Sequence, residues 1–371
     1  MHSPQQLIEN LLQGTGIGIN GPEPWDMTVH DERTYSRILG QASLGLGEAF
    51  MEGWWDCRAL DEFFFRILRK RLDKRLPFNL SAFLQVLKAR LFNQQTRSRS
   101  KIVALRHYDI GNELYRHMLD KRMIYSCAYW AGAETLDEAQ EHKLDLICRK
   151  LKLETGMRLL DIGCGWGGLA QFAAEKYRVS VTGVTISEQQ AIIARRATEG
   201  LPVNIRLLDY RDLHEQFDRI VSVGMFEHVG YKNYRTFMQT AGENLADDGI
   251  FLLHTIGGIE SVKNTDAWID QYIFPNSMVP SAEQITGAIK GVFILEDWHN
   301  FGLDYDRTCM AWLKNFNRSW PELSNRYDDA FYRMWTYYLN MCAASFRVKK
   351  NQLWQIVLTK PGRLAGYRSV R

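Results

Sequence analysis

Short apolar segments alternate with helical segments between residues 158 and 256, and this alternation constrains the fold more than any other feature of the 371-residue chain. Short apolar strands joined by helices form a mostly parallel sheet that is covered on both faces. We expect strands at 158–163, 179–187, 203–210, 217–226 and 249–256, with helices at 167–177, 188–200 and 234–245. The sequence therefore predicts an α/β fold.

The first part of the chain has a different pattern. Residues 1–60 indicate short helices broken by glycine and proline, with a loop at 14–25. In 61–92, apolar residues recur every three or four positions with basic residues between them, which is typical of amphipathic helices. We expect a small, mainly helical N-terminal domain at 1–92, a linker at 93–101 without apolar residues, and a second domain at 102–371.

The distribution of charge says more about partners than the total does. Forty-six basic and 43 acidic residues give a net charge of only +3, which does not indicate nucleic acid as a partner. Residues 61–106, however, contain twelve basic and three acidic residues. Basic amphipathic helices suit anionic membrane surfaces, to which Trp54 and Trp55 would add contact. The alternative, which the helical pattern alone favours, is that the apolar stripe packs inside the domain.

The expected compartment follows from absent signals. No segment has the roughly 18 consecutive apolar residues of a membrane span, and the first residues lack a signal-peptide pattern. We therefore expect a cytoplasmic protein. The cysteines are scattered, without the spacing of a zinc site, so we expect free thiols and no metal. These cysteines are Cys57, Cys127, Cys148, Cys164, Cys309 and Cys342.

A glycine loop follows the first predicted strand of the sheet. Residues 161–168 read DIGCGWGG and place Gly163, Gly165 and Gly167 where the strand turns into a helix. Glycines there let the backbone approach a ligand closely. The spacing GxGxG differs from the GxGxxG of dinucleotide-binding proteins and fits the loop that holds S-adenosylmethionine in Rossmann-like methyltransferases. Thr185 and Gln190 stand where many such enzymes have an acidic residue for the ribose hydroxyls.

Motifs in order along the chain carry a family resemblance. They are YSCAYW (125–130), LLDIGCGWGG (159–168), GVTIS (183–187), DRIVSVGMFEHVG (218–230), FLLHTIG (251–257), EDWHNFGLDYDRT (296–308) and YYLNMCAASFR (337–347). With these motifs the chain resembles the cyclopropane and mycolic acid cyclopropane synthases. The segment SLGLGEAFMEGWWDC (43–57) is similar to the extra N-terminal domain of the bacterial phospholipid branch.

The resemblance implies a Rossmann-like S-adenosylmethionine-dependent methyltransferase fold and a defined reaction. S-adenosylmethionine donates a methyl group to the cis double bond of a membrane phospholipid, and the methyl carbon becomes the bridging methylene of a cyclopropane ring. The intermediate carbocation loses a proton to a bound bicarbonate. The resemblance also implies a homodimer that associates peripherally with the inner membrane surface.

Site residues are carried over from the same motifs. Bicarbonate would be held by Cys127, Glu227, His254 and Tyr305 and by the backbone of Ile256. The positions implied for S-adenosylmethionine are Tyr125, Ser126, Asp161, Gly163, Cys164, Gly165, Gly167, Thr185, Gln190, Tyr210 and Arg211. Asp209 is an equally good partner for the adenine amino group. Aromatic candidates for stabilising the cation are Trp130, Tyr305, Trp298 and Phe274.

Several assignments keep a structural alternative. Glu227 could be a capping or surface carboxylate, and His254 a hydrogen-bonded core histidine. Cys127 could serve packing alone. Cys342 is a candidate nucleophile, but its apolar helical setting favours packing.

The function also has alternatives. One is a methyltransferase for another lipid or a small molecule, and another is a non-catalytic lipid-binding protein on the same fold. A nicotinamide oxidoreductase is disfavoured by the glycine spacing.

Overall fold

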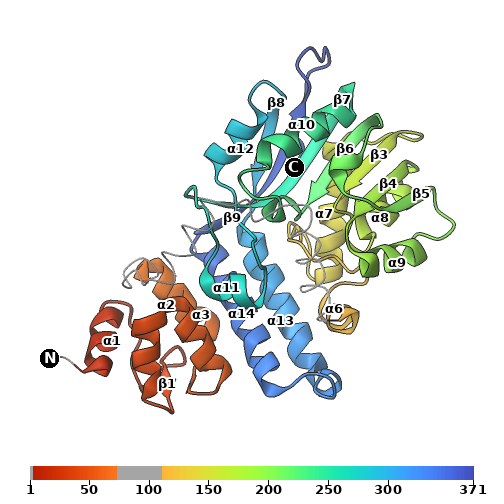
Figure 1. Cartoon of the computed structure of the whole chain (residues 1–371). Helices are drawn as coiled ribbons and strands as arrows, with labels where there is room; N and C mark the ends of the chain where they lie inside the picture. The colour runs from red at the N-terminus through yellow and green to blue at the C-terminus, as the bar shows by residue number, and fades with distance from the viewer. Residues whose placement is uncertain (1–2, 73–110) are drawn as a thin grey trace. The chain divides into compact units, whose positions relative to one another are not determined.

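The computed structural model describes residues 3–72 and 111–371, which fall into two compact units (Figure 1). The sheet unit contains the described part of Asn93–Lys263 together with Asn276–Asp304 and Gln352–Arg371. The helical unit contains the described part of Met1–Phe92 together with Asn264–Pro275 and Tyr305–Asn351. The units therefore divide the chain differently from the expected domains 1–92 and 102–371, because two later segments group with the N-terminal residues. The expected linker 93–101 lies outside the described residues.

Within the described residues, the sheet unit has seven strands in the order β5-β4-β3-β6-β7-β9-β8. β3, β4, β5, β6 and β7 run parallel in their pairings, and β8 pairs antiparallel with β9. The strands are β3 (Arg158–Ile162), β4 (Ser180–Thr185), β5 (Val203–Leu207), β6 (Phe217–Val223), β7 (Leu245–Gly258), β8 (Ile294–Asn300) and β9 (Asn351–Thr359). The carboxyl ends of the five parallel strands lie at one edge, which is where open α/β sheets bind ligands.

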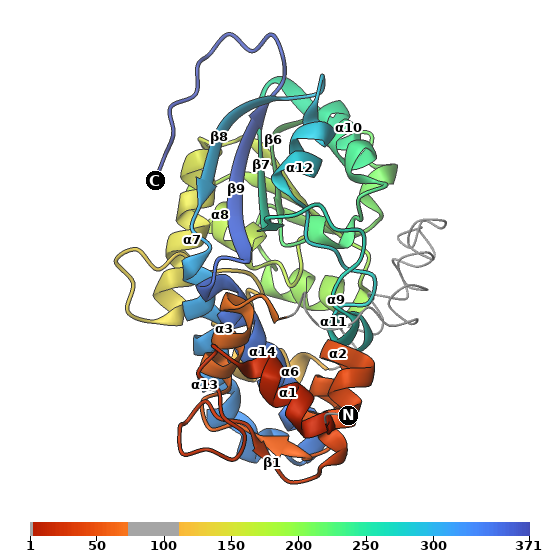
Figure 2. The ribbon, with the colours of Figure 1, turned by 90° about the vertical axis from the view of Figure 1, so that its left-hand side faces the viewer.

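Helices cover both faces of this sheet, as Figure 2 shows for α7 and α8 on one side and α10 and α12 on the other. Neighbouring strand residues point to opposite faces. Leu159 packs with the residues of α7 and α8, whereas Leu160 packs with those of α10 and α12. The helices of the sheet unit are α6 (Asn112–Met118), α7 (Leu136–Lys150), α8 (Gly168–Tyr177), α9 (Glu188–Ala197), α10 (Tyr234–Asn244) and α12 (Ala282–Ile289).

The sequence-based expectations for this region are confirmed. All five expected strands and all three expected helices occur, with ends that differ by a few residues. β7 is longer than expected, and the antiparallel pair β8 and β9 was not predicted. The chain has the Rossmann-like α/β fold.

The helical unit brings together segments that are far apart in the sequence. α14 packs against α2 and α3, and α11 also packs against α2. Trp55, Phe64, Trp268 and Tyr337 are buried at their centre, and the Tyr337 ring contacts those of Phe64 and Trp268. The elements are α1 (Pro4–Leu12), β1 (Thr28–Val29), α2 (Arg33–Met51), β2 (Trp55–Asp56), α3 (Leu60–Arg69), α11 (Ala267–Tyr272), α13 (Leu303–Leu323) and α14 (Asp329–Arg347).

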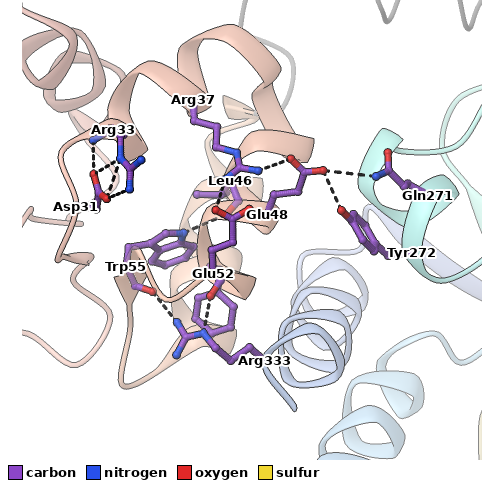
Figure 3. A network of polar contacts seen from close by, with 11 residues as sticks. Asp31, Arg33, Arg37, Leu46, Glu48, Glu52, Trp55, Gln271, Tyr272 and Arg333 are labelled. Atoms are coloured by element: carbon purple, nitrogen blue, oxygen red, sulfur yellow. Dashed lines mark hydrogen bonds and ion pairs between the residues drawn. The ribbon is translucent and has the colours of Figure 1, made fainter. Parts of the chain in front are cut away.

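Polar contacts reinforce this packing (Figure 3). The Arg333 guanidinium on α14 donates hydrogen bonds to the carbonyl oxygens of Phe50 and Trp55, and it stacks over the Phe50 ring. Glu48 on α2 accepts a hydrogen bond of 2.9 Å from the Tyr272 hydroxyl on α11. The N-terminal helices are therefore joined by side-chain contacts to two helices more than 200 residues later in the chain.

The predicted membrane contact through Trp55 is wrong. Its side chain is fully buried, and its indole N–H donates to the Leu46 carbonyl oxygen. Trp54 is half-buried, with the guanidinium groups of Arg33 and Arg37 over its ring.

The apolar stripe of α3 packs inside the helical unit. Phe63 and Phe64 on this helix are buried, which confirms the packing alternative for α3. The rest of the predicted amphipathic stretch, residues 73–92, lies outside the described part of the chain. Within 3–72 and 111–371, every helix falls short of the length or the apolar character needed to cross a bilayer.

Candidate active site

The glycine loop lies at the carboxyl end of β3 and has the backbone conformation that only glycine adopts easily. Gly163, Gly165 and Gly167 have φ values of 85°, 53° and 87°. A Cβ on Gly163 would lie 2.7 Å from Met225 Cγ, which is too close for carbon atoms. Cys164 is buried, and its backbone N–H donates to the Val184 carbonyl oxygen on β4. The positive φ values therefore favour glycine at these three positions, and the contact of this loop with a ligand stays a prediction.

Thr185 and Gln190 contact each other at the next strand end. Thr185 is the last residue of β4, whereas Gln190 lies in the first turn of α9. The Thr185 hydroxyl donates a hydrogen bond of 2.9 Å to Gln190 Oε1, and both side chains are buried. This contact fixes the amide so that its two N–H donors face away from Thr185. Such donors suit ribose hydroxyls.

Tyr210 and Arg211 form a single 3-10 turn (Tyr210–Asp212) after β5. The Asp209 carboxylate accepts hydrogen bonds of 2.8 and 2.5 Å from the Arg211 guanidinium. The Tyr210 ring meets the Phe237 ring edge-on at a centroid distance of 5.2 Å. The three candidates for the adenine therefore lie at one strand end, and Arg211 is already bound to Asp209.

The segment that contains Tyr125, Ser126 and Cys127 is held by α7. Gln140 Nε2 donates to the Ser126 carbonyl oxygen at 2.9 Å, and Lys143 Nζ donates to Ser126 Oγ at 2.8 Å. Ser126 and Cys127 are buried. Cys127 Sγ lies 3.2 Å from the carbonyl oxygen of the next residue, Ala128.

Asp161 precedes the glycine loop and is buried in β3. Burial raises the pKa of its carboxyl to about 7, and the nearby Lys143 ammonium opposes that rise. Burial also lowers the pKa of Lys143 to about 8. A carboxyl and an ammonium group thus share the buried region behind the glycine loop.

Glu227 lies in a 3-10 turn (Phe226–His228) that follows β6, and its carboxylate reaches β7. The Ile256 backbone N–H donates a hydrogen bond of 2.6 Å to Glu227 Oε1. Glu227 Oε2 is buried and has no hydrogen-bond partner among the residues that the structure describes. Burial raises the pKa of Glu227 to about 7, while the Ile256 hydrogen bond acts in the opposite direction. The structure therefore brings Glu227 and the Ile256 backbone together, but the Ile256 N–H binds the Glu227 carboxylate. Its assignment to bicarbonate stays a prediction from the resemblance.

His254 lies two residues before Ile256 on β7, opposite Val223 at the end of β6. Its Nδ1 accepts a hydrogen bond of 3.3 Å from Gln355 Nε2, which puts the proton of the neutral ring on Nε2. Nε2 is buried and, within the described residues, has no partner. Burial, helped by Lys143 and Lys150, lowers the pKa of His254 well below its ordinary value. The ring is a neutral hydrogen-bond donor.

Tyr305 and Cys342 belong to the helical unit. The Tyr305 ring stacks on Phe346 at 4.4 Å. Cys342 lies on α14, where burial raises the pKa of its thiol to about 12. That shift keeps the thiol protonated and supports packing over nucleophilic chemistry.

Three of the four aromatic candidates for stabilising the cation, Tyr305, Trp298 and Phe274, contact other aromatic rings. The Trp298 ring contacts the Trp354 ring, and the Phe274 ring contacts the Tyr338 ring. The Trp130 backbone N–H donates to the Asp304 carboxylate. Among residues 3–72 and 111–371, no three His, Cys, Asp or Glu side chains form a group that could hold a metal ion.

The sequence analysis missed Lys143, Gln140 and Gln355. Gln140 and Lys143 are three residues apart on one face of α7, and both are buried. Their position next to the hydrophobic residues Leu144 and Ile147 was the available signal, since polar residues on the buried face of a helix require partners.

Comparison with known proteins identifies relatives over most of the chain. The family model described as mycolic acid cyclopropane synthetase matches residues 94–356. The chain is 52% identical over 355 residues to the cyclopropane-fatty-acyl-phospholipid synthase of Escherichia coli strain K12, covering 96% of this chain and 93% of that protein.

Solved structures show the same similarity over a shorter range. The cyclopropane synthase MmaA2 from Mycobacterium tuberculosis has 32% sequence identity and a TM-score of 0.66, covering 70% of this chain and 98% of that one. The mycolic acid cyclopropane synthase CmaA1, in complex with SAH (S-adenosylhomocysteine) and CTAB, has 30% identity and the same TM-score over 70% of this chain and 98% of that one.

Proposed function

The chain belongs to the mycolic acid cyclopropane synthetase family, and we propose that it is an S-adenosylmethionine-dependent enzyme that forms cyclopropane rings in phospholipid acyl chains. The substrate is the cis double bond of an unsaturated chain, and the products are the cyclopropane lipid, S-adenosylhomocysteine and a proton. The identity to the E. coli phospholipid synthase, which extends over 96% of the chain, supports the phospholipid as substrate. The observation that carries the chemistry is that two of the nine buried polar atoms without partners in the described residues, Glu227 Oε2 and His254 Nε2, belong to residues assigned to the anion.

The residues at the strand ends fit S-adenosylmethionine, which would supply the methyl group. The loop from Gly163 to Gly167 would pass close to its ribose and methionyl portions. The Gln190 amide donors would bind the ribose hydroxyls, in place of the usual carboxylate. Tyr210 and Arg211, or Asp209, would lie at the adenine.

The buried pair of Glu227 and His254 fits bicarbonate. This anion has one hydroxyl donor and two further oxygens that accept. Glu227 Oε2 would accept from the hydroxyl, and the His254 Nε2–H would donate to another oxygen. The Ile256 N–H, which the resemblance assigned to the anion, donates to Glu227 instead and orients that carboxylate. Cys127 completes the proposed set within the sheet unit, and Tyr305, which lies in the helical unit, stays a prediction from the resemblance.

In this scheme the protein aligns the alkene with the methyl group, excludes water and holds a base. An isolated alkene is a weak nucleophile, so methyl transfer requires close alignment in a dry pocket. Glu227 and His254, both nearly inaccessible to solvent, would keep the base in place while the acyl chain carries positive charge. The proton leaves the transferred carbon as the ring closes, and it would pass to the bound base.

We also propose a cytoplasmic location with peripheral association at the inner membrane surface. The excess of nine positive charges in residues 61–106 supports attraction to anionic lipid. Residues 1–92 would form the lipid-contacting part, and a homodimer is the proposed assembly. Sedimentation with anionic and with neutral vesicles, at low and at high salt, tests the attraction, because charge-driven binding weakens as salt rises.

The decisive experiment follows the acyl chains. Purified protein is incubated with methyl-labelled S-adenosylmethionine and vesicles of cis-unsaturated phospholipid, with and without bicarbonate, and the fatty acids are analysed by mass spectrometry. A gain of one labelled CH₂ with loss of the double bond supports the proposal. Labelled product that keeps its double bond would indicate another methyltransferase reaction, and absence of transfer would indicate a lipid-binding protein.

A further inference from the structure

The inner face of α7 has a buried lysine beside the proposed site. Lys143 is 1% exposed, and its Nζ donates to Ser126 Oγ at 2.8 Å. The Lys143 ammonium group has three N–H donors, and among the described residues the Ser126 hydroxyl is the acceptor that the structure gives for them. Burying an ammonium group without an anionic partner is unfavourable, so a residue of this kind needs a counter-charge.

A second buried lysine on the same helix provides a contrast. Lys150 Nζ lies 2.9 Å from His299 Nδ1 and 4.0 Å from an Asp297 carboxylate oxygen. Within the described ranges, no carboxylate lies within that distance of Lys143. Lys150 therefore has a carboxylate at ion-pair distance, whereas the carboxylates whose charges act on Lys143, Asp120 and Asp161, lie farther from its ammonium group.

The position of Lys143 relates it to two parts of the proposed anion site, the Ser126–Cys127 segment and His254. Ser126, which it holds, directly precedes Cys127. Its charge also acts on the Cys127 thiol and on His254. Glu227 and the anion would both be negative, so a nearby positive charge is needed for them to share one buried site.

We propose that Lys143 is a positioning residue that supplies the buried positive charge for the anion site and fixes the Ser126–Cys127 segment beside it. This inference rests on the proposed function, because it assigns a role toward the bicarbonate introduced there. It predicts that loss of the charge weakens anion binding rather than the chemical step at saturating anion.

The test uses the full-length chain and ¹³C-labelled bicarbonate in carbon dioxide-depleted buffer with saturating S-adenosylhomocysteine. Line broadening of the ¹³C resonance gives the Kd without any turnover, and cyclopropane formation gives the half-saturating bicarbonate concentration. The variants are Lys143→Met, Lys143→Arg and, as a matched buried-lysine control, Lys150→Met. If Lys143→Met does not fold, Lys143→Gln replaces it, because glutamine keeps a donor for Ser126 without the charge.

We expect Lys143→Met to raise both constants by about tenfold or more, with turnover largely restored at saturating bicarbonate. Lys143→Arg and Lys150→Met should stay within about threefold, the first because it keeps the charge and the second because Asp297 pairs with Lys150, whose charge acts on His254 less than that of Lys143 does. An unchanged Kd in Lys143→Met, an equal change in Lys150→Met, or turnover lost at every bicarbonate concentration would overturn the inference.

The two readouts separate this inference from the proposed reaction. Anion binding that depends on Lys143, in a protein that forms no cyclopropane product, would refute the reaction and support the role of Lys143. Cyclopropane formation without any broadening by the wild-type protein would refute that role and leave the reaction in place.

Discussion

Replacing Glu227 by glutamine is expected to stabilise the protein while it abolishes activity. The carboxylate is buried, one oxygen accepts from the Ile256 N–H, and the other has no partner in the described part of the structure. A glutamine has nearly the same shape, and its carbonyl oxygen can accept the same hydrogen bond. The substitution therefore removes the buried charge without removing the packing.

The size of the gain follows from the pKa of Glu227. Burial raises this pKa from 4.5 to about 7 in the folded protein. Because the folded value is the higher one, the stabilising contribution is complete below pH 4.5 and is lost as the pH rises through about 7. Each pH unit between the two values corresponds to about 1.4 kcal/mol, so ionised Glu227 costs about 3 kcal/mol at pH 8.

Urea unfolding at pH 5, 6, 7 and 8 in bicarbonate-free buffer measures this difference. The unfolding free energy of Glu227→Gln should exceed that of wild type by an amount that grows to about 3 kcal/mol at pH 8. Glu243→Gln on the exposed surface of α10 is the control and should follow the wild-type curve. Parallel curves for Glu227→Gln and wild type from pH 5 to pH 8 would refute the reasoning.

Three further substitutions test other parts of the structure. Gly163→Ala should weaken S-adenosylhomocysteine binding, measured by calorimetry, by about tenfold or more, because a Cβ there meets Met225 and φ is 85°; an unchanged Kd would contradict this role. Arg333→Met should lower the unfolding free energy by about 3 kcal/mol through lost hydrogen bonds, whereas exposed Arg33→Met should change it by about 0.5 kcal/mol at most; equal effects would count against the account. Cys342→Ala should keep turnover within about twofold, since a thiol with a pKa of about 12 stays protonated, and a hundredfold loss would restore the nucleophile hypothesis.

Local periodicity was enough to predict the parallel part of the sheet. The strands from β3 to β7 contain apolar runs, and an α-helix lies in three of their four connections, so their order along the chain could be predicted. β8 could not be predicted in the same way, because ILEDWHN mixes apolar and charged residues and most of the strand is not buried. Its place in the sheet depends on pairing with β9, about 60 residues later.

The candidate site was predictable where a residue's type carries its role. The glycines of the loop have the positive φ values that their residue type suggests, and Glu227 lies against the Ile256 backbone, although the resemblance assigned both to an anion. Lys143 was not predictable, because a lysine on a helix is usually solvated, and only tertiary packing buries this one. The prediction for Trp55 was wrong because an indole that suits a membrane surface also suits a protein core, where this side chain is buried.

The helical unit combines early and late segments of the chain, so it can be completed only near the end of synthesis. Arg333 and the Phe50 carbonyl that it binds are 283 residues apart. At a synthesis rate of about 5 to 20 residues per second, α14 would leave the ribosome about 15 to 60 s after α2 and α3. During that interval the apolar faces that later contact Trp268 and Tyr337 have no native partner to cover them. Nascent chains should therefore bind chaperones mainly through their first 70 residues, until the last helices are made.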